Sequence, residues 1–168
     1  MDLRVGLAAC IVVGSALIGK SFTGAAHRRV RALRNVTEGV KKLRIRVVNM
    51  SEPLRNALDQ SDCPLLSRVG GQMRQGLSAG EAWLSLKSAD RAVGGPTDAL
   101  CTSDVQVLDE LFERLGQSGR EAQEILLTGA IRSLEGLCDA ARCKAGEADR
   151  LYAVLGLLIG LMIALIVI

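Results

Sequence analysis

Few residues of this 168-residue chain are of the types that carry out chemistry, and their spacing does not group them. His27 is the only histidine and lies among arginines, where a solvated surface residue is more common than a general base. Cys138 and Cys143 are five residues apart, but no second pair and no clustered histidines complete a zinc site. The glycine-rich stretches GGQMRQG and SAGEAW lack the spacing and lysine of a phosphate-binding loop. We therefore predict no catalytic residue, no metal, no cofactor and no enzymatic activity.

The cysteines also argue against an oxidising compartment. They are odd in number and widely scattered, which is a poor framework for disulfides. A reducing compartment is the simpler interpretation. The five are Cys10, Cys63, Cys101, Cys138 and Cys143.

A strongly basic stretch lies near the start of the chain. Residues 27–46 read HRRVRALRNVTEGVKKLRIR, with eight arginines and lysines against one acid, Glu38. Nucleic-acid binding is disfavoured, because the stretch has no interleaved aromatic residues, no helix-turn-helix pattern and no RNP-type motif. Attraction to anionic lipid headgroups fits better, because an apolar run precedes the stretch. Arg28, Arg29 and Arg31 are thus candidate partner or lipid contacts.

The last eighteen residues, LYAVLGLLIGLMIALIVI at 151–168, contain no charge, no amide and no proline. A helix of this length extends roughly 27 Å, close to the thickness of the hydrocarbon core of a bilayer. The run therefore predicts a transmembrane helix. Its small residues recur every four positions, at Gly156, Gly160 and Ala164, and are candidates for close helix packing in the membrane.

A second apolar run, VGLAACIVVGSALIG, lies at residues 5–19 between Arg4 and Lys20. A cleaved signal peptide is one interpretation, since small residues at 24–26 could form a cleavage site. The cluster of positive charge that follows opposes translocation and favours a retained anchor with the central segment in the cytoplasm. We therefore predict transmembrane helices over 1–20 and 151–168 around a cytoplasmic helical domain over 21–150.

Helical spacing dominates the central segment. An apolar stripe predicts one long helix over about 30–47, and a second stripe predicts a nearly continuous helix from about residue 119 into the final apolar run. No segment shows a convincing alternation typical of strands, so the predicted class is all-α. The first stripe comprises Val30, Leu33, Val36 or Thr37, Val40, Leu43 and Val47, and the second Ile125, Leu126, Gly129, Leu134, Leu137 and Ala141.

Start and stop signals divide the rest into shorter helices. Ser51 is expected to cap a helix that has Pro53 in its first turn, and Pro64 to open another that ends near Gly76. Three pairs of residues have the spacing of a capping box, and each predicts the start of a further helix. Gly116 is expected to end the helix that precedes the last one. The pairs are Ser78 with Glu81, Ser103 with Gln106, and Ser118 with Glu121.

Four motifs in this order resemble the stage III sporulation protein AB family: PLRNAL at 53–58, GEAW at 80–83, LGQSGREAQ at 115–123 and YAVLGLLIG at 152–160. The likeness runs nearly end to end, and the order and spacing of the motifs are more specific than any one of them. The family usually has aspartate after the serine, where this chain has Gly119. Within the motifs, Glu81, Trp83, Ser118 and Gln123 are candidate partner contacts, although caps and a core tryptophan are the plainer interpretations.

That family is similar to the F-type platform proteins of type II secretion and type IV pilus machines. The resemblance implies a multi-pass membrane component of the channel between mother cell and forespore, in the outer forespore membrane. Its helical domain would dock a secretion-type ATPase like stage III sporulation protein AA. Other implied partners are stage III sporulation membrane proteins, membrane lipids and further copies of the chain, without nucleic acid. A generic membrane-anchored adaptor or sensor is the alternative, and a secreted polyanion-binding protein is a third interpretation.

Overall fold

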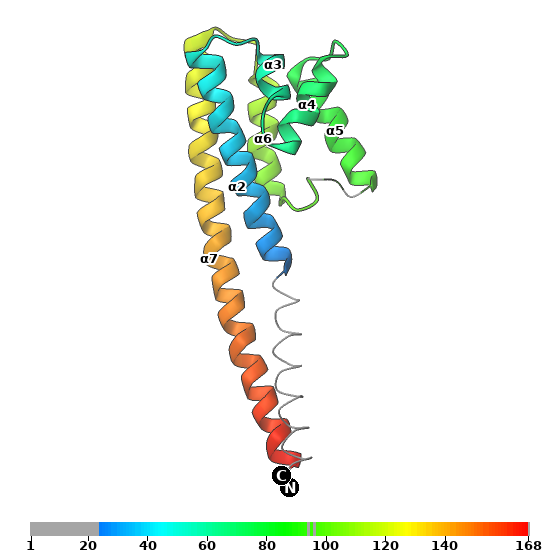
Figure 1. Ribbon diagram of the computed structural model, residues 1–168, viewed down its shortest axis with the longest axis vertical. Coiled ribbons are helices and arrows are strands. Elements are labelled where there is room, and N and C mark those ends of the chain that lie inside the picture. The colour runs from blue at the N-terminus through cyan, green and yellow to red at the C-terminus, as the bar shows by residue number, and fades with distance from the viewer. Residues whose placement is uncertain (1–23, 94, 96, 168) are drawn as a thin grey trace. The chain divides into compact units, whose positions relative to one another are not determined.

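The computed structural model describes residues 24–93, 95 and 97–167 (Figure 1). Its elements are α2 (Gly24–Arg44), a π-helical segment η1 (Ile45–Asn49), α3 (Leu54–Asp59), α4 (Pro64–Met73), α5 (Ala79–Val93), α6 (Thr102–Arg114) and α7 (Arg120–Val167). Every regular element of the described chain is thus helical, which confirms the all-α class. The predicted first span, residues 1–20, lies outside the described residues.

The chain divides into two compact units. The core unit is Arg31–Asp139, and the terminal unit combines Met1–Val30 with Ala140–Ile168. Both long helices contribute to both units, because α2 begins in the terminal unit and α7 ends there. Each unit is described separately below.

In the core unit, α2 and α7 run antiparallel side by side (Figure 1). Lys41 Nζ lies 2.9 Å from Glu135 Oε1, and Arg44 Nη1 donates to Thr128 Oγ1 at 3.3 Å. Helices α3, α4, α5 and α6 pack successively on one another. Their apolar stripes and those of α2 and α7 form one buried core. Its largest fully buried side chains are Trp83, Phe112, Leu33, Leu43, Leu58, Leu66, Leu108, Leu111, Leu127, Leu134, Val40 and Val69.

The predicted stripe of α2 is buried from Leu33 to Leu43, whereas its first residue, Val30, is half-buried, and after Leu43 the stripe shifts by one residue. Leu33, Val36, Val40 and Leu43 are buried, but the next buried residue is Val48 rather than the predicted Val47. The cause is the π-helical segment, in which the Met50 amide donates to the Ile45 carbonyl at 3.3 Å. A π turn holds an extra residue, so the side chain that faces the core comes five positions after Leu43 instead of four.

The next helix does not begin as predicted. Ser51 has a φ of 53°, and the residue in the cap position of α3 is Pro53. The carbonyl of Pro53 accepts the amides of Asn56 and Ala57 at 2.9 and 3.1 Å. The serine precedes the helix by too many residues to reach its free amides, so the prediction that Ser51 caps it is wrong.

Helix α4 begins at Pro64, as predicted, and Gly76 follows its end with a φ of 93°. Its two internal glycines differ in their surroundings. A Cβ at Gly70 would lie 2.6 Å from the amide nitrogen of Asp59, whereas a Cβ at Gly71 would meet nothing within 4 Å. Gly70 therefore allows α4 to approach the end of α3 closely.

Two predicted caps have different outcomes. Before α5, Ser78 and Glu81 form the predicted box: the Glu81 amide donates to Ser78 Oγ at 3.3 Å and the Ser78 amide to Glu81 Oε2 at 2.9 Å. Before α6, the prediction of Ser103 with Gln106 is wrong. The helix begins at Thr102, and the amide of Cys101 donates to Asp104 Oδ2 at 2.9 Å. An aspartate three residues after the cap can make the bond expected of glutamate.

Helix α7 is continuous over 48 residues, which confirms one helix from about residue 119 into the final apolar run. It buries a different stripe from the predicted one. Leu134 and Ala141 are buried as expected, but Ile125 is 75% exposed and Gly129 is also exposed. Small and apolar residues occur on more than one face of this helix, so spacing alone selected the wrong one. The buried stripe is Leu127, Ala130, Ile131, Leu134, Cys138, Ala141 and Ala145.

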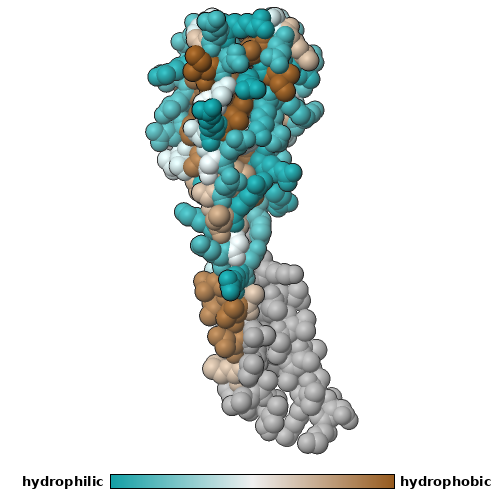
Figure 2. Space-filling view, turned by 90° about the vertical axis from the view of Figure 1, so that its left-hand side faces the viewer, coloured by the Kyte–Doolittle hydropathy of each residue, from teal (hydrophilic) through white to brown (hydrophobic). Residues whose placement is uncertain are grey.

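In the terminal unit, His27 Nε2 lies 2.9 Å from Asp149 Oδ2 and joins α2 to α7. Beyond this contact α7 carries exposed apolar side chains, shown in brown on its C-terminal part in Figure 2. They include Leu151, Val154, Leu155, Leu158 and Met162. Among the residues that the structure describes, no helix has the length and apolar character required to cross a membrane.

Candidate functional site

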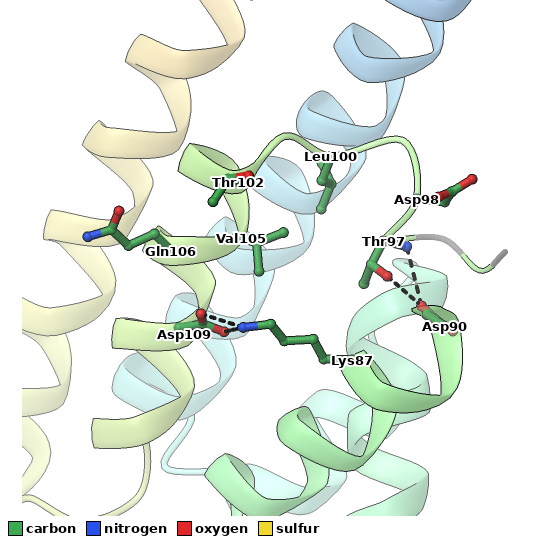
Figure 3. Close-up of a pocket in the computed structure, with 9 residues that line it drawn as sticks. All are labelled: Lys87, Asp90, Thr97, Asp98, Leu100, Thr102, Val105, Gln106 and Asp109. Carbon is green, nitrogen blue, oxygen red and sulfur yellow. Dashed lines mark hydrogen bonds and ion pairs between the residues drawn. The ribbon is translucent and has the colours of Figure 1, made fainter. Parts of the chain in front are cut away.

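A cavity of about 380 Å³ lies between α5 and α6 in the core unit. Figure 3 shows Lys87 of α5 reaching toward Asp109 of α6, with Leu100 and Val105 beside the space between them. The loop before α6 supplies another wall. The cavity is lined by Lys87, Asp90, Thr97, Asp98, Leu100, Thr102, Val105, Gln106 and Asp109.

Asp109 is the acceptor for two side chains of α5. Lys87 Nζ donates to its two oxygens at 2.9 and 2.7 Å, and Trp83 Nε1 donates to Oδ1 at 2.6 Å. The indole ring of Trp83 is buried and stacks on Phe112, with ring centroids 5.0 Å apart. The tryptophan therefore belongs to the core, and its nitrogen hydrogen-bonds to a carboxylate that lines the cavity.

Asp90 is a buried carboxylate on the opposite wall. Its oxygens accept from Arg68 Nη1 at 2.8 Å and from the Thr97 hydroxyl at 3.0 Å and amide at 3.3 Å. The backbone of Gly95 packs so closely on this carboxylate that a Cβ there would overlap it. Hydrogen bonding offsets the cost of burying the charge and ties α4 and the loop to α5.

Elsewhere on the core unit, two pairs of charged side chains are exposed, one acidic and one basic. Glu110 and Glu113 lie three residues apart on α6, and Arg31 and Arg34 lie three residues apart on α2. These four side chains make no hydrogen bond or ion pair with the described residues. Other charges of α2 are paired: Lys41 with Glu38 and Glu135, and Lys42 with Asp62.

The motif residues proposed from the sequence do not form one site. Glu81 accepts the amide and hydroxyl of Ser78, which hold the pKa of its carboxyl below the ordinary value. Gln123 Nε2 donates to the Ser118 carbonyl at 3.0 Å, so these two residues meet at the start of α7. Because α7 begins at Arg120, Ser118 precedes the cap position, and the bond to Gln123 differs from the predicted box with Glu121.

The remaining predicted residues lie in or next to the terminal unit. Arg28 and Arg31 are exposed, and Arg29 is half-buried and engaged in an interaction. Gly156 is buried, whereas the side-chain surroundings of Gly160 and Ala164 lie outside the described residues. Whether these residues contact partners, lipid or another helix stays a prediction.

Sequence reasoning missed Lys87, Asp90 and Asp109, which give the cavity its charge. Lys87 pairs with Asp109 and Asp90 pairs with Arg68, and in each pair the two residues are 22 positions apart. Helical spacing relates residues only three or four positions apart, so it could not identify these pairs. One signal in the sequence could have pointed to Lys87 and Asp109: each directly follows a leucine of the apolar stripe, as in Leu86-Lys87 and Leu108-Asp109. Across the described residues, no group of three histidine, cysteine or acidic side chains could hold a metal ion. Most of the side chains that line the cavity are polar or charged.

Comparison with known proteins gives one result. No curated protein and no solved structure matches the chain. The family model described as stage III sporulation protein AB matches residues 4–168, nearly the whole chain. The match includes all four motifs, the core unit and the final apolar run, and membership implies a role in stage III of sporulation. The chain belongs to the stage III sporulation protein AB family.

Proposed function

We propose that this protein is a non-enzymatic platform component of the stage III sporulation membrane assembly. Its two apolar ends anchor it in the outer forespore membrane, and the core unit lies in the cytoplasm. Membership of the family supports an association with that assembly and with other stage III sporulation proteins. The observation that carries the proposal is the continuity of α7. The first part of this helix packs in the core unit, and its last part is the uncharged apolar run.

The sequence supports both membrane anchors and their orientation. Residues 151–168 have no charged side chain, and residues 5–19 form a second apolar run followed by the basic cluster. Positive charge beside a membrane segment favours the cytoplasmic side. In this arrangement Arg28, Arg29 and Arg31 lie close enough to the bilayer to attract anionic headgroups.

The core unit then serves as a docking surface for a secretion-type ATPase. Its charged side chains are engaged in structural pairs such as Lys87 with Asp109 and Arg68 with Asp90. The proposal is tested by co-purification of the full-length chain with the ATPase of the same assembly, and by a bacterial two-hybrid assay. Failure of both assays would remove this partner.

Topology is tested by thiol labelling in intact cells. A variant that keeps only Cys101, which is exposed, is treated with a membrane-impermeant maleimide before and after lysis. Protection until lysis, at full-length mass, is expected. A cysteine-free variant carrying Asp2→Cys is the matched control, and it should be labelled in intact cells. Labelling of Cys101 without lysis would place the core unit outside and end the docking proposal.

A further inference from the structure

The terminal unit carries two exposed arginines beside the contact that joins its helices. His27 Nε2 of α2 lies 2.9 Å from Asp149 Oδ2 of α7, and Arg28 and Arg150 are the next residues on the two helices. Neither arginine makes a hydrogen bond or an ion pair with the described residues. Both guanidinium groups are therefore available to a ligand.

Helix geometry places these two arginines on the same side of the helix pair. Successive side chains turn by about 100° around a helix. Because α2 and α7 run antiparallel, this turn is clockwise along one helix and anticlockwise along the other in a single view (Figure 1). His27 and Asp149 point at each other, so one further residue on each helix rotates Arg28 and Arg150 toward a common side. Packed helices lie about 8–10 Å apart, and a phosphate group between the two guanidiniums can accept hydrogen bonds from both.

Apolar side chains continue this side of α7 beyond Arg150. Val154 and Leu158 follow at intervals of four residues, and they are 51% and 57% exposed. Figure 2 shows the change from hydrophilic to hydrophobic side chains along this part of the helix. Two arginines next to an exposed apolar stripe match an amphiphile with an anionic headgroup and an apolar tail.

The acids near the two arginines do not neutralise them. Asp149 is engaged with His27. Glu147 precedes Arg150 by three residues, but it is exposed and forms no ion pair with it. On α2, no residue three or four positions from Arg28 is acidic; these residues are Gly24, Ala25, Arg31 and Ala32. The side of the helix pair that carries Arg28 and Arg150 is therefore complementary to an anion.

We propose that Arg28 and Arg150 hold the phosphate of an anionic phospholipid, with an acyl chain along Val154 and Leu158. This site rests on the membrane anchoring proposed above, which brings this end of the helix pair to the headgroup layer. It differs from a general attraction of the basic stretch, because one of its two arginines belongs to α7. The bound lipid links α2 to α7 where the apolar run of α7 begins.

The test is the binding of short-chain lipids to the full-length chain in detergent, measured by native mass spectrometry. The wild type should bind dioctanoyl phosphatidylglycerol about tenfold more tightly than dioctanoyl phosphatidylcholine, because the arginines repel the cationic choline group. Arg28→Lys with Arg150→Lys keeps both charges but removes the paired donors of the guanidinium groups, so most of this preference should be lost. Glycerol 3-phosphate, which has no acyl chain, should bind more weakly than phosphatidylglycerol.

Two further variants serve as controls. Arg55→Lys with Arg114→Lys makes the same change at two exposed arginines of the core unit and should keep the wild-type preference. Glu147→Gln removes the acid three residues before Arg150 and should strengthen the binding of phosphatidylglycerol. Circular dichroism checks that each variant has the helix content of the wild type.

Several outcomes would overturn the lipid site. Equal binding of the two lipids by the wild type would do so, as would a wild-type preference in the Arg28 and Arg150 double variant. Loss of the preference in the core-unit control would show that only bulk positive charge matters. Binding of glycerol 3-phosphate as tight as that of phosphatidylglycerol would remove a lipid as the occupant.

Failure of the lipid site can be distinguished from failure of the proposed function. Protection of Cys101 in intact cells without a lipid preference in detergent would overturn the site and leave the membrane anchoring in place. Labelling of Cys101 in intact cells would contradict the proposed topology, whereas the lipid preference is measured on the purified chain in either case. Since the lysine variants keep both positive charges, Cys101 should stay protected in them as well.

Discussion

Trp83 and Asp109 are joined by a 2.6 Å hydrogen bond across 26 residues of sequence. The same carboxylate receives the ammonium of Lys87, so one side chain of α6 holds two side chains of α5. Trp83 is the only tryptophan of the chain. Its fluorescence therefore reports on the contact between these two helices without interference from another indole.

Replacing Asp109 should destabilise the protein. Asp109→Ala removes the acceptor of the buried Trp83 indole and of Lys87, and leaving such groups unpaired costs about 1–3 kcal/mol. The measurement is urea unfolding of the full-length chain in detergent, followed by Trp83 emission. Glu110→Ala, on the adjacent exposed position, is the control and should change the free energy of unfolding by less than about 0.5 kcal/mol. Equal effects would show that the hydrogen bond contributes nothing.

The neighbouring glycines of α4 should respond in opposite directions to the same substitution. Gly71→Ala should stabilise the protein by about 0.5–1 kcal/mol, because alanine favours a helix and its methyl group meets open space. Gly70→Ala should destabilise it, because the methyl group would lie 2.6 Å from the Asp59 amide nitrogen. Thermal unfolding by circular dichroism distinguishes the two variants. Stabilisation by both would mean that α3 can move away at little cost.

Gly95 and Asp90 should behave as a coupled pair. Gly95→Ala places a methyl group in the space of the Asp90 carboxylate, and Asp90→Ala removes that carboxylate together with the acceptor of Arg68 and Thr97. Each single variant should be destabilised, but the double variant should lose less than the sum of the two. The free energies of unfolding of all four proteins give the coupling. An additive result would show that the loop avoids the overlap.

The cap of α5 should make stability depend on pH. Hydrogen bonds from Ser78 lower the pKa of Glu81 in the folded protein below its value in the unfolded chain. The stabilising contribution is therefore present above the ordinary carboxyl pKa and is lost as the pH falls through the lowered one. Glu81→Gln should have a lower Tm than the wild type at pH 7, and the difference should shrink toward pH 3. A constant difference would mean that the charge of Glu81 is not responsible.

The sequence predicted well those features that depend on neighbours along the chain. Helix spacing placed Leu33 to Leu43 in the core, and Pro64, Gly116 and the Ser78 box marked helix ends. It failed where several faces of one helix looked alike. On α7, Ile125 fits a stripe as well as Leu127 does, and only packing against α2 and the short helices decides which is buried.

The candidate site was harder to predict than the helices. Spacing finds Glu81 and Ser78, because they are three residues apart. It cannot find Asp109 with Lys87, or Asp90 with Arg68, because those partners meet only after α4, α5 and α6 have packed. Trp83 was proposed as a contact on the strength of its motif, and its buried ring shows that the motif is at least partly a packing requirement.

The π turn after α2 also affects how the chain can vary in length. An inserted or deleted residue within Leu33–Leu43 would rotate part of the apolar stripe by about 100° and move its side chains away from the core. Removing one residue within Ile45–Asn49 has a different consequence, since the turn already holds one residue more than an α turn. The shortened segment can continue as α-helix and keep a valine facing the core. Within α2 and η1, this short segment is thus where the loss of one codon should disturb folding least.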